Sequence, residues 1–378
     1  MNFLDRKVNM SNVLFYMAYI LLIVQSMTRW VNNIAVFQLI CTKGIPIILF
    51  LCIITRLKKF NYNNLLVMCF LLLCVTLSYL VSKDIVILNL MLFLIASKGI
   101  HLDKIVKVDL VIKIIMLFTI FLLYYAGYTQ QIIDYTNTRG IRYSFGFGHP
   151  NTLGVYIMGI CADIAYLNFS RKKKLWYIVM IVAAIFLEIN CDSRGSVACI
   201  ILLLVLSFLM PKLQNNKIIK NIMIYIFPTF MILSFVVAYI FMINSNNEIL
   251  LQLDELFSSR ISLTAAFLKE YSIHLFGSRF INYGTGTIGT TFVLDNAYMS
   301  LLIKFGLLVA LLFIVYIPKC LKSAFNNKQY PLIICLFVFI IFGLMENGFY
   351  VLFYNLYLLA LAPIIFKTKV IEVNNENK

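Results

Sequence analysis

Long apolar stretches separated by short polar ones recur along the whole chain. Twelve apolar segments can be marked, roughly 12–28, 33–55, 65–82, 84–97, 108–127, 149–168, 175–190, 196–211, 220–243, 296–317, 330–345 and 349–366. Most of them are long enough to cross about 30 Å of hydrocarbon as helices, although the fourth is short and the eleventh has polar ends. The pattern predicts an all-α, polytopic integral membrane protein with about twelve transmembrane helices, forming a single domain over residues 1–378.

The composition agrees with this interpretation. The chain has 378 residues, of which 62% are hydrophobic and 13% are charged, and its mean hydropathy is +0.92. A water-soluble domain of this size would carry far more polar surface. The nine cysteines lie mostly inside apolar segments and form no CxxC pair. We therefore expect neither a disulfide framework nor a metal site, and no cofactor.

The basic residues indicate an orientation. Twenty-one of the 32 lysines and arginines lie in the N-terminal segment, in alternate loops and in the C-terminal tail. Because basic loops stay on the cytoplasmic side, this alternation predicts a multi-pass protein of the cell membrane with both termini cytoplasmic. The formal charge of +16 then reflects topology and attraction to anionic lipids, so no nucleic-acid partner is expected.

The predicted outer face has a different basic composition. Its two longest loops are residues 128–148 and 244–295, and eight basic residues lie on it, six of them arginines. Arginine presents a planar fork that grips phosphate and carboxylate in two-point contacts, whereas lysine is sufficient for orientation. The excess of arginine therefore indicates an anionic ligand on this face.

The sixth apolar segment is preceded by the sequence "RYSFGFGHPNTLG" at 142–154. Pro150 is suited to the first turn of a helix, since its missing N–H would have no intrahelical partner there. His149 and Asn151 flank it, and Arg139 and Arg142 precede it. This arrangement predicts a helix N-terminus that faces two arginines and binds an anion. The alternative is a membrane-entry turn whose arginines contact lipid phosphates.

Three further motifs lie on the same predicted face. The tight turn "CDSRGS" at 191–196 contains Arg194, which the turn does not require. The segment 254–277 has the periodicity of an amphipathic helix in the headgroup plane, with Arg260 and His274 among its polar members. Asp295 and Asn296 begin the tenth segment, where Asp295 is either a helix cap or a catalytic carboxylate.

Four ionisable residues stand apart from these motifs. Glu346 lies in the turn "MENGF", and turn chemistry is the favoured explanation for it. Asp163 lies near a helix end, where capping or snorkelling would satisfy it. Lys113 and Lys304 lie inside apolar segments, which predicts that each faces a cavity or a partner.

Taken in order, these motifs resemble the O-antigen polymerase and ligase superfamily of bacterial membrane glycosyltransferases. The matching stretches are "GHPNTLG", "SRG", "SSRISLTAAFLKEYSIHLFGS" and "DNAYMSLLIKFGLL". The motifs lie from about residue 140 onward, and the similarity in hydropathy extends over the whole chain. The resemblance implies a GT-C-like helical fold with a long extracytoplasmic loop between helices 9 and 10. Ligases carry a histidine where this chain has Asp295, so the polymerase branch is the better match.

The resemblance also implies an activity. The chain would join repeat units carried on undecaprenyl pyrophosphate, without a metal, at the outer face of the membrane, building capsular, O-antigen or exopolysaccharide chains. The pyrophosphate and glycan would be held by polar residues of the outer loops, namely Arg139, Arg142, His149, Asn151, Arg194, Arg260, Arg279 and Asn296. Asp295 is the first candidate for the general base and His274 the second. Implied partners are the lipid-linked glycans, the bilayer, and a chain-length regulator and a flippase of the same pathway.

The sequence is also consistent with alternative functions. A ligase-type glycan transferase would differ from a polymerase only in its acceptor. A lipid-linked oligosaccharide flippase or another transporter is the alternative from a different class, and Lys113 and Lys304 favour it. An acyltransferase acting on the cytoplasmic side is the weakest alternative, because the cytoplasmic loops offer only His101 and scattered lysines.

Overall fold

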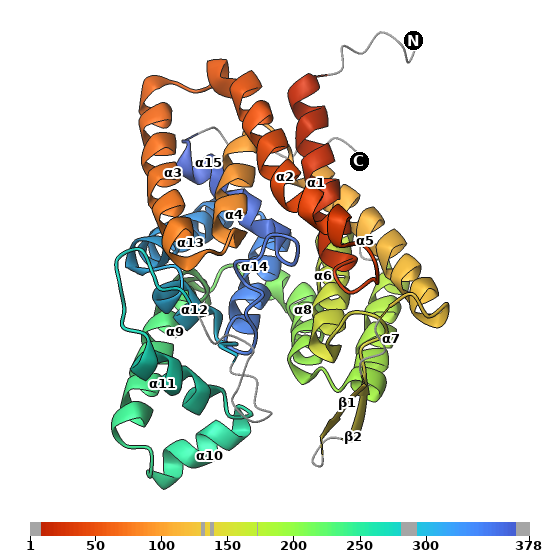
Figure 1. Cartoon of the computed structure of the whole chain (residues 1–378), viewed down its shortest axis with the longest axis vertical. Helices are drawn as coiled ribbons and strands as arrows, with labels where there is room; N and C mark the ends of the chain where they lie inside the picture. The colour runs from red at the N-terminus through yellow and green to blue at the C-terminus, as the bar shows by residue number, and fades with distance from the viewer. Residues whose placement is uncertain (1–8, 130–132, 137–139, 172, 281–292, 368–378) are drawn as a thin grey trace.

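The computed structural model describes residues 9–129, 133–136, 140–171, 173–280 and 293–367. Its helices are α1 (Met10–Met27), α2 (Ala35–Arg56), α3 (Tyr62–Ser82), α4 (Val86–Ala96), α5 (Leu102–Tyr125), α6 (Pro150–Asn168), α7 (Lys174–Cys191), α8 (Arg194–Leu213), α9 (Lys217–Ile243), α10 (Glu248–Leu256), α11 (Arg260–Glu270), α12 (Ala297–Ile303), α13 (Leu307–Asn326), α14 (Tyr330–Phe342) and α15 (Leu361–Ile365). Two short 3-10 helices, η2 (Leu57–Lys59) and η3 (Leu356–Ala360), and a pair of strands complete the described elements. The helices pack side by side, and α1 begins at the same end of the molecule where α15 lies (Figure 1).

Seven of the described helices are long and apolar enough to cross a membrane, namely α1, α2, α3, α7, α8, α9 and α13. The share of each apolar window that is buried in the protein is only 22% to 39%. Large apolar side chains cover the rest, as a surface in contact with lipid requires. A helical multi-pass membrane protein is thus confirmed. The number of twelve spans stays a prediction, because α4, α14 and the stretch Leu356–Ile365 are shorter apolar helices.

The tenth predicted segment is not one helix. Residues 296–317 are divided into α12 and α13 at Gly306, whose φ is 95°. The long loop docks into this break: the carbonyls of His274 and Leu275 accept hydrogen bonds from the first two N–H groups of α13. A Cβ atom on Gly306 would lie 2.3 Å from the backbone nitrogen of Gly277. The prediction of a continuous helix was wrong because a glycine and a docked loop together satisfy the new helix start.

The two long loops contain regular structure. Within 128–148, strands β1 (Ile133–Thr136) and β2 (Gly140–Tyr143) form an antiparallel hairpin. The loop 244–295 contains α10 and α11, and α11 packs against α9. Of the amphipathic helix expected over 254–277, helical conformation is confirmed for 254–256, at the end of α10, and for α11, while its position in the headgroup plane stays a prediction.

The best-buried helices lie at the centre of the bundle. α6 and α14 are buried along most of their length, and both pack against α8. α5 packs against α6 and α1. Because α6 and α14 are held on all sides, the turns at their ends are fixed in place, and those turns carry the residues of the candidate site.

Candidate functional site

The entry to α6 has the predicted form. Pro150 occupies the first turn, and His149 is the N-cap residue, its Nδ1 accepting a hydrogen bond of 3.1 Å from the backbone N–H of Asn151. Gly148 has a φ of +73°, and a Cβ atom there would lie 2.2 Å from the ring of Trp30. The glycine is therefore required both for the backbone conformation and for the contact with Trp30. The sequence prediction of a helix start at this point is confirmed.

Arg142 leads from the hairpin into the helix bundle. Its side chain is buried, with 4% of the residue exposed. Its Nε donates to the carbonyl of Cys191 over 2.9 Å, and its Nη2 donates to Oδ1 of Asn151 over 2.7 Å. This guanidinium connects β2, the start of α6 and the end of α7, so it fixes the side-chain amide of Asn151 in one orientation.

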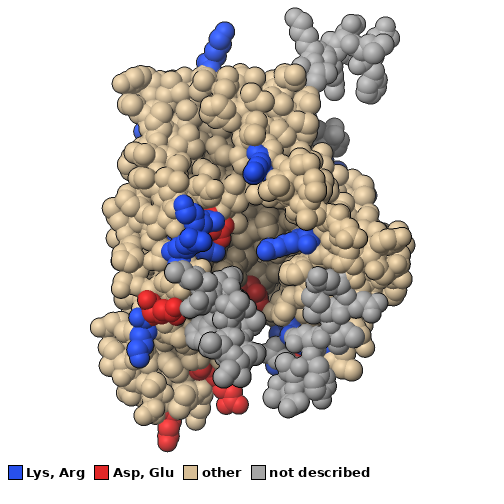
Figure 2. Space-filling view, in the orientation of Figure 1, with Lys and Arg blue, Asp and Glu red and all other residues tan. Residues whose placement is uncertain are grey.

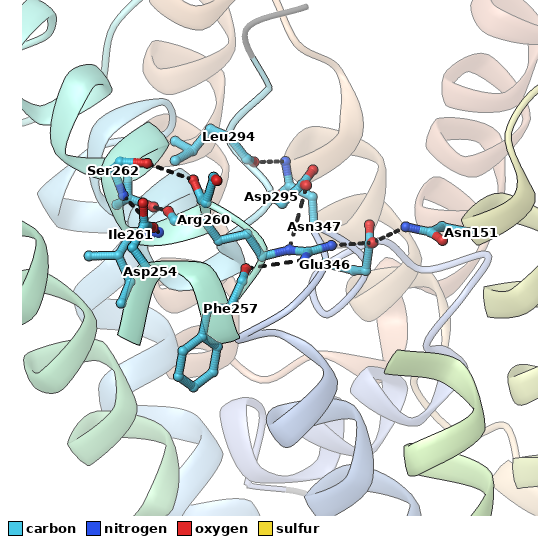
Figure 3. Close-up of polar contacts among 12 residues, drawn as sticks. Asn151, Asp254, Phe257, Arg260, Ile261, Ser262, Leu294, Asp295, Glu346 and Asn347 are labelled. Carbon is cyan, nitrogen blue, oxygen red and sulfur yellow. Dashed lines mark hydrogen bonds and ion pairs between the residues drawn. The ribbon is translucent and has the colours of Figure 1, made fainter. Parts of the chain in front are cut away.

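The amide of Asn151 continues the network toward the other half of the chain. Its Nδ2 donates to Oε1 of Glu346 over 2.6 Å. The same oxygen accepts a hydrogen bond of 3.0 Å from Nη2 of Arg260, and Nε of Arg260 lies 3.6 Å from Oδ2 of Asp295. Figure 3 shows these contacts. We call Arg142, Asn151, Arg260, Asp295 and Glu346 the Arg260 cluster.

Arg260 is positioned by the helix that it begins. Oδ1 of Asp254, in α10, accepts hydrogen bonds of 2.9 Å from the backbone N–H groups of Ile261 and Ser262 (Figure 3). This carboxylate caps α11 from outside, because the residue before Arg260 makes no side-chain cap. The carbonyl of Phe257 accepts from Nη1 of Arg260 over 3.4 Å. The guanidinium is therefore held at the first turn of α11, pointing toward Glu346.

The turn after α14 is attached to the start of α12. Nδ2 of Asn347 donates to the carbonyl of Leu294 over 2.9 Å (Figure 3). The carbonyl of Gly343 accepts from the N–H of Ala297, also over 2.9 Å. These two hydrogen bonds bring Glu346 next to Asp295, although the two residues are far apart in the sequence.

Asn296, and not Asp295, caps α12. Its Oδ1 accepts from the backbone N–H groups of Tyr298 and Met299 over 3.0 Å, and its Nδ2 donates to Ser234 over 3.1 Å. Asp295 is thus released from the capping role that the sequence left open, and its carboxylate faces Arg260. A substrate-binding role for Asn296 stays a prediction.

The cluster brings two carboxylates to one guanidinium at a partly exposed position. The side chains of Arg260 and Glu346 are each 19% exposed, and that of Asp295 is 26% exposed. Burial, together with the negative charge of Asp295, raises the pKa of Glu346 to about 7, against the opposing effects of Arg260 and Asn151. Burial also raises the pKa of Asp295, while Arg260 lowers it. A carboxyl group that titrates near neutral pH can accept a proton from a substrate hydroxyl.

An apolar pocket of about 210 Å³ lies next to Arg260, between α9 and α11. Its apolar lining comes chiefly from Phe230, Leu233, Val237, Phe257, Ile261 and Leu344. Arg260 and Asn296 also line it, so the charged cluster and the apolar pocket share a wall. The arrangement can hold a molecule that has a hydrocarbon part and an anionic or sugar part.

Other predicted site residues lie elsewhere on the protein. The side chain of Arg194 is 66% exposed, and its Nε donates to Oδ1 of Asp192 over 2.9 Å. Asp192 directly follows Cys191, whose carbonyl accepts the hydrogen bond from Arg142. Arg279 is exposed and lines a separate pocket of about 430 Å³ together with Lys83 and Lys304. Figure 2 shows basic side chains on both sides of a hollow in this face of the molecule.

His274 and Arg139 complete the predicted set. The side chain of His274 is exposed, and among the described residues no hydrogen bond or ion pair joins it or Arg279 to the Arg260 cluster. Arg139 lies outside the described residues. Of the predicted site residues, the structure therefore brings together Arg142, Asn151, Arg260 and Asp295. The roles of all the predicted residues stay predictions.

Glu346 is the member of the cluster that the sequence interpretation missed. Turn chemistry was the favoured explanation, yet the carboxylate bonds to Asn151 and Arg260. Asp163 was also misjudged: it is fully buried and accepts a hydrogen bond from Tyr357, so neither capping nor snorkelling satisfies it. In both cases the partner lies far away along the chain, where local sequence gives no signal of it.

No family model, curated protein or solved structure matches this chain. The described residues form a helical multi-pass membrane protein with seven candidate spans.

Proposed function

We propose that this protein is a polysaccharide polymerase of the cell membrane. It would join oligosaccharide repeat units carried on undecaprenyl pyrophosphate, at the outer face of the membrane, as its resemblance to the O-antigen polymerase and ligase superfamily implies. The observation that carries the proposal is the position of the Arg260 cluster, which combines arginines, two carboxylates and an adjoining apolar pocket. A lipid-linked sugar diphosphate has the complementary parts.

The arginines would serve the leaving group. Arg260, with 19% of its side chain exposed, can bind an incoming diphosphate while it also contacts Glu346. As the bond between the anomeric carbon and the diphosphate oxygen breaks, negative charge develops on that oxygen, and a guanidinium at this point stabilises it. Lipid pyrophosphate is already a good leaving group, so this chemistry requires no metal.

A carboxylate of the cluster would serve the attacking sugar. The acceptor hydroxyl forms the new bond to the anomeric carbon and loses its proton to the base. Glu346, with a pKa near 7, is suited to this step because it is partly deprotonated at neutral pH and still a competent base. Asp295, the base expected from the sequence, would then raise the pKa of Glu346 by its negative charge. It is also the second candidate for the general base.

The apolar pocket would hold the lipid. Its walls come from α9 and α11, and it opens beside Arg260. A polyprenyl chain lying there would place its diphosphate at the guanidinium of Arg260. The anomeric carbon of the sugar would then be held in position for the reaction without a covalent bond to the protein. The apolar pocket would thus bind the lipid and the charged cluster the diphosphate, as a reaction at a membrane surface requires.

A transporter of lipid-linked oligosaccharides is the second candidate function. The observation in its favour is a set of fully buried charges, Asp109, Lys113 and Asp163, inside the helix bundle. Ionisable groups in that position are frequent in proteins that move ions or solutes. A ligase-type transferase would use the Arg260 cluster in the same way as a polymerase, with a different acceptor.

The decisive experiment is reconstitution of the purified protein in vesicles with lipid-linked oligosaccharides from its own host. A polymerase yields a ladder of chain lengths, and Arg260→Gln lowers its rate by about 10²- to 10³-fold. Lys269→Gln is the matched control, since Lys269 is an exposed cation on the same helix. Movement of the oligosaccharide across the bilayer without bond formation would support the transporter instead. Single addition to a different acceptor would support the ligase.

A further inference from the structure

Three ionisable side chains lie together inside the bundle, away from the Arg260 cluster. Asp109 and Lys113 belong to α5, and Asp163 belongs to the neighbouring helix α6; their exposed fractions are 0%, 1% and 0%. Nζ of Lys113 lies 2.6 Å from Oδ2 of Asp109. The hydroxyl of Tyr357 donates to Oδ1 of Asp163 over 2.8 Å. Gly159 makes room for the group, because a Cβ atom there would lie 3.2 Å from Nζ of Lys113.

The charges of this group do not balance. Two carboxylates share one ammonium, which leaves one negative charge among side chains that are not exposed to bulk solvent. Asp109 and Asp163 are close enough to interact directly. The remaining oxygens, Oδ1 of Asp109 and Oδ2 of Asp163, make no hydrogen bond in the described part of the chain, and the hydroxyl of Tyr19, which faces Asp109, makes none there either. The other titratable groups that face the site carry no positive charge; they are Tyr19, Cys161, Cys335 and Tyr357.

A single proton resolves both problems. Bound to one carboxyl and directed at the other, it cancels the excess charge and supplies the missing donor. An uncompensated buried carboxylate is one of the most costly features a protein interior can contain. A protonated carboxyl hydrogen-bonded to its neighbour costs far less, because both remaining oxygens are then satisfied.

Two neighbouring tyrosines lie between this group and a pocket. Tyr166 donates to Oδ1 of Asp103 over 2.6 Å, and its ring lies 5.6 Å from that of Tyr357. Both Asp103 and Tyr166 line a pocket of about 340 Å³, and His101 also lines it. Two tyrosines therefore stand between a solvent-accessible pocket and Asp163.

We propose that Asp109 and Asp163 form a proton-binding site, which holds one proton beside Lys113 and exchanges it with the pocket at His101 by way of Tyr166 and Tyr357. This inference is independent of the proposed polymerase activity. Release of the proton leaves an uncompensated charge between α5 and α6, so proton exchange is coupled to the packing of these two helices.

The test is infrared difference spectroscopy of the full-length protein in lipid nanodiscs. The wild type shows the C=O stretching band of a protonated carboxyl at a pH where exposed carboxyls are ionised, and Asp163→Asn abolishes it. Glu346→Gln is the matched control, because it removes a different carboxyl, one that titrates near pH 7. Tyr166→Phe slows hydrogen–deuterium exchange of the band without removing it. With Glu346→Gln also present, so that Glu346 contributes no signal, a band that persists in both Asp163→Asn and Asp109→Asn overturns the proposal.

Two further measurements keep the result unambiguous. Asn matches a protonated Asp in shape, so Asp163→Asn lowers the melting temperature by less than about 2 °C. A cooperative loss of folding in both Asp163→Asn and Asp109→Asn would show that neither carboxyl is protonated in the folded protein, and the proposal would then fall. Addition of Na⁺ at fixed pH leaves the band in place; its disappearance on Na⁺ binding would identify a metal-cation site in place of a proton site.

Discussion

Two charged clusters touch the same helix, α6, and they differ in solvent access and in charge balance. The Arg260 cluster combines two carboxylates with two guanidinium groups, and the side chains at its open side are 19% to 26% exposed. The group around Asp109 combines two carboxylates with one ammonium, and it is almost completely buried. The exposed cluster can therefore accept a ligand without first losing its own partners, whereas the buried one can accept only something as small as a proton.

The difference also concerns what holds each cluster in place. The Arg260 cluster is assembled from loop and helix-end residues, so hydrogen bonds to the backbone and the cap from Asp254 position it. The buried group lies within two packed helices, α5 and α6, so helix packing positions it. Loss of a charge should then affect mainly activity in the first cluster and mainly stability in the second.

The largest expected effect is on stability. Lys113→Met removes the ammonium from Asp109 and leaves a carboxylate buried without its partner, which costs about 3–5 kcal/mol. Arg260→Gln should cost much less, because water can reach the carboxylates it leaves behind. Thermal unfolding of both variants in the same detergent checks this contrast. Equal losses of stability would show that burial does not separate the two clusters.

The next effect is on the rate of bond formation. Glu346→Gln keeps the hydrogen bonds to Asn151 and Arg260 approximately in shape but cannot accept a proton. We expect polymerisation to fall by about 10²- to 10⁴-fold, with little change in the melting temperature. Glu248→Gln is the control, since Glu248 is an exposed carboxylate in α10. A Glu346→Gln variant with full activity would assign the base to another residue, and Asp295 would be tested next.

A smaller effect distinguishes two arginines of the site. Arg142→Lys should destabilise the protein by about 1–3 kcal/mol, because one ammonium cannot replace the fork that serves both Cys191 and Asn151. Arg194→Lys should change stability by about 1 kcal/mol or less, since 66% of the Arg194 side chain is exposed. Chemical or thermal unfolding of the two variants measures the difference. A reversed order would mean that the buried contacts of Arg142 contribute little.

The sequence predicted the local features of the fold well. Pro150 and the glycines before it gave the start of α6, and the turn at 191–196 gave the start of α8. These features are decided by backbone conformation and by capping, which depend on a few adjacent residues. The break before α13 was missed, although Gly306, following Lys304 and Phe305, is the kind of residue that ends a helix.

The site was predictable only in part, for a physical reason. An outer-face arginine conflicts with the topology bias, so Arg142 and Arg260 could be singled out one at a time. Glu346 had a sufficient local explanation, and its pairing with Arg260 depends on how α11 and α14 pack. Asp109 and Lys113 are spaced i and i+4 on one helix, a pattern that a search for ion pairs would have found.

The smallest expected effect is also the sharpest test of how the Arg260 cluster works. If Glu346 is the base, activity is low where it is protonated, and kcat/KM rises with pH through an apparent pKa near 7. The charge of Asp295 raises the pKa of Glu346, so Asp295→Asn should shift this rise to lower pH. The hydrogen bond from Asn151 lowers the pKa of Glu346, so Asn151→Ala should shift the rise to higher pH.

Opposite shifts from these two neighbours would be difficult to obtain from any base other than Glu346, because each neighbour acts on the same carboxylate through a different contact. A base at His274 would leave both profiles where the wild type has them, since that side chain is exposed and makes no described contact with the cluster. A base at Asp295 would abolish activity in Asp295→Asn over the whole pH range. The direction of the two shifts, measured on either side of pH 7, therefore decides whether Glu346 or Asp295 is the general base.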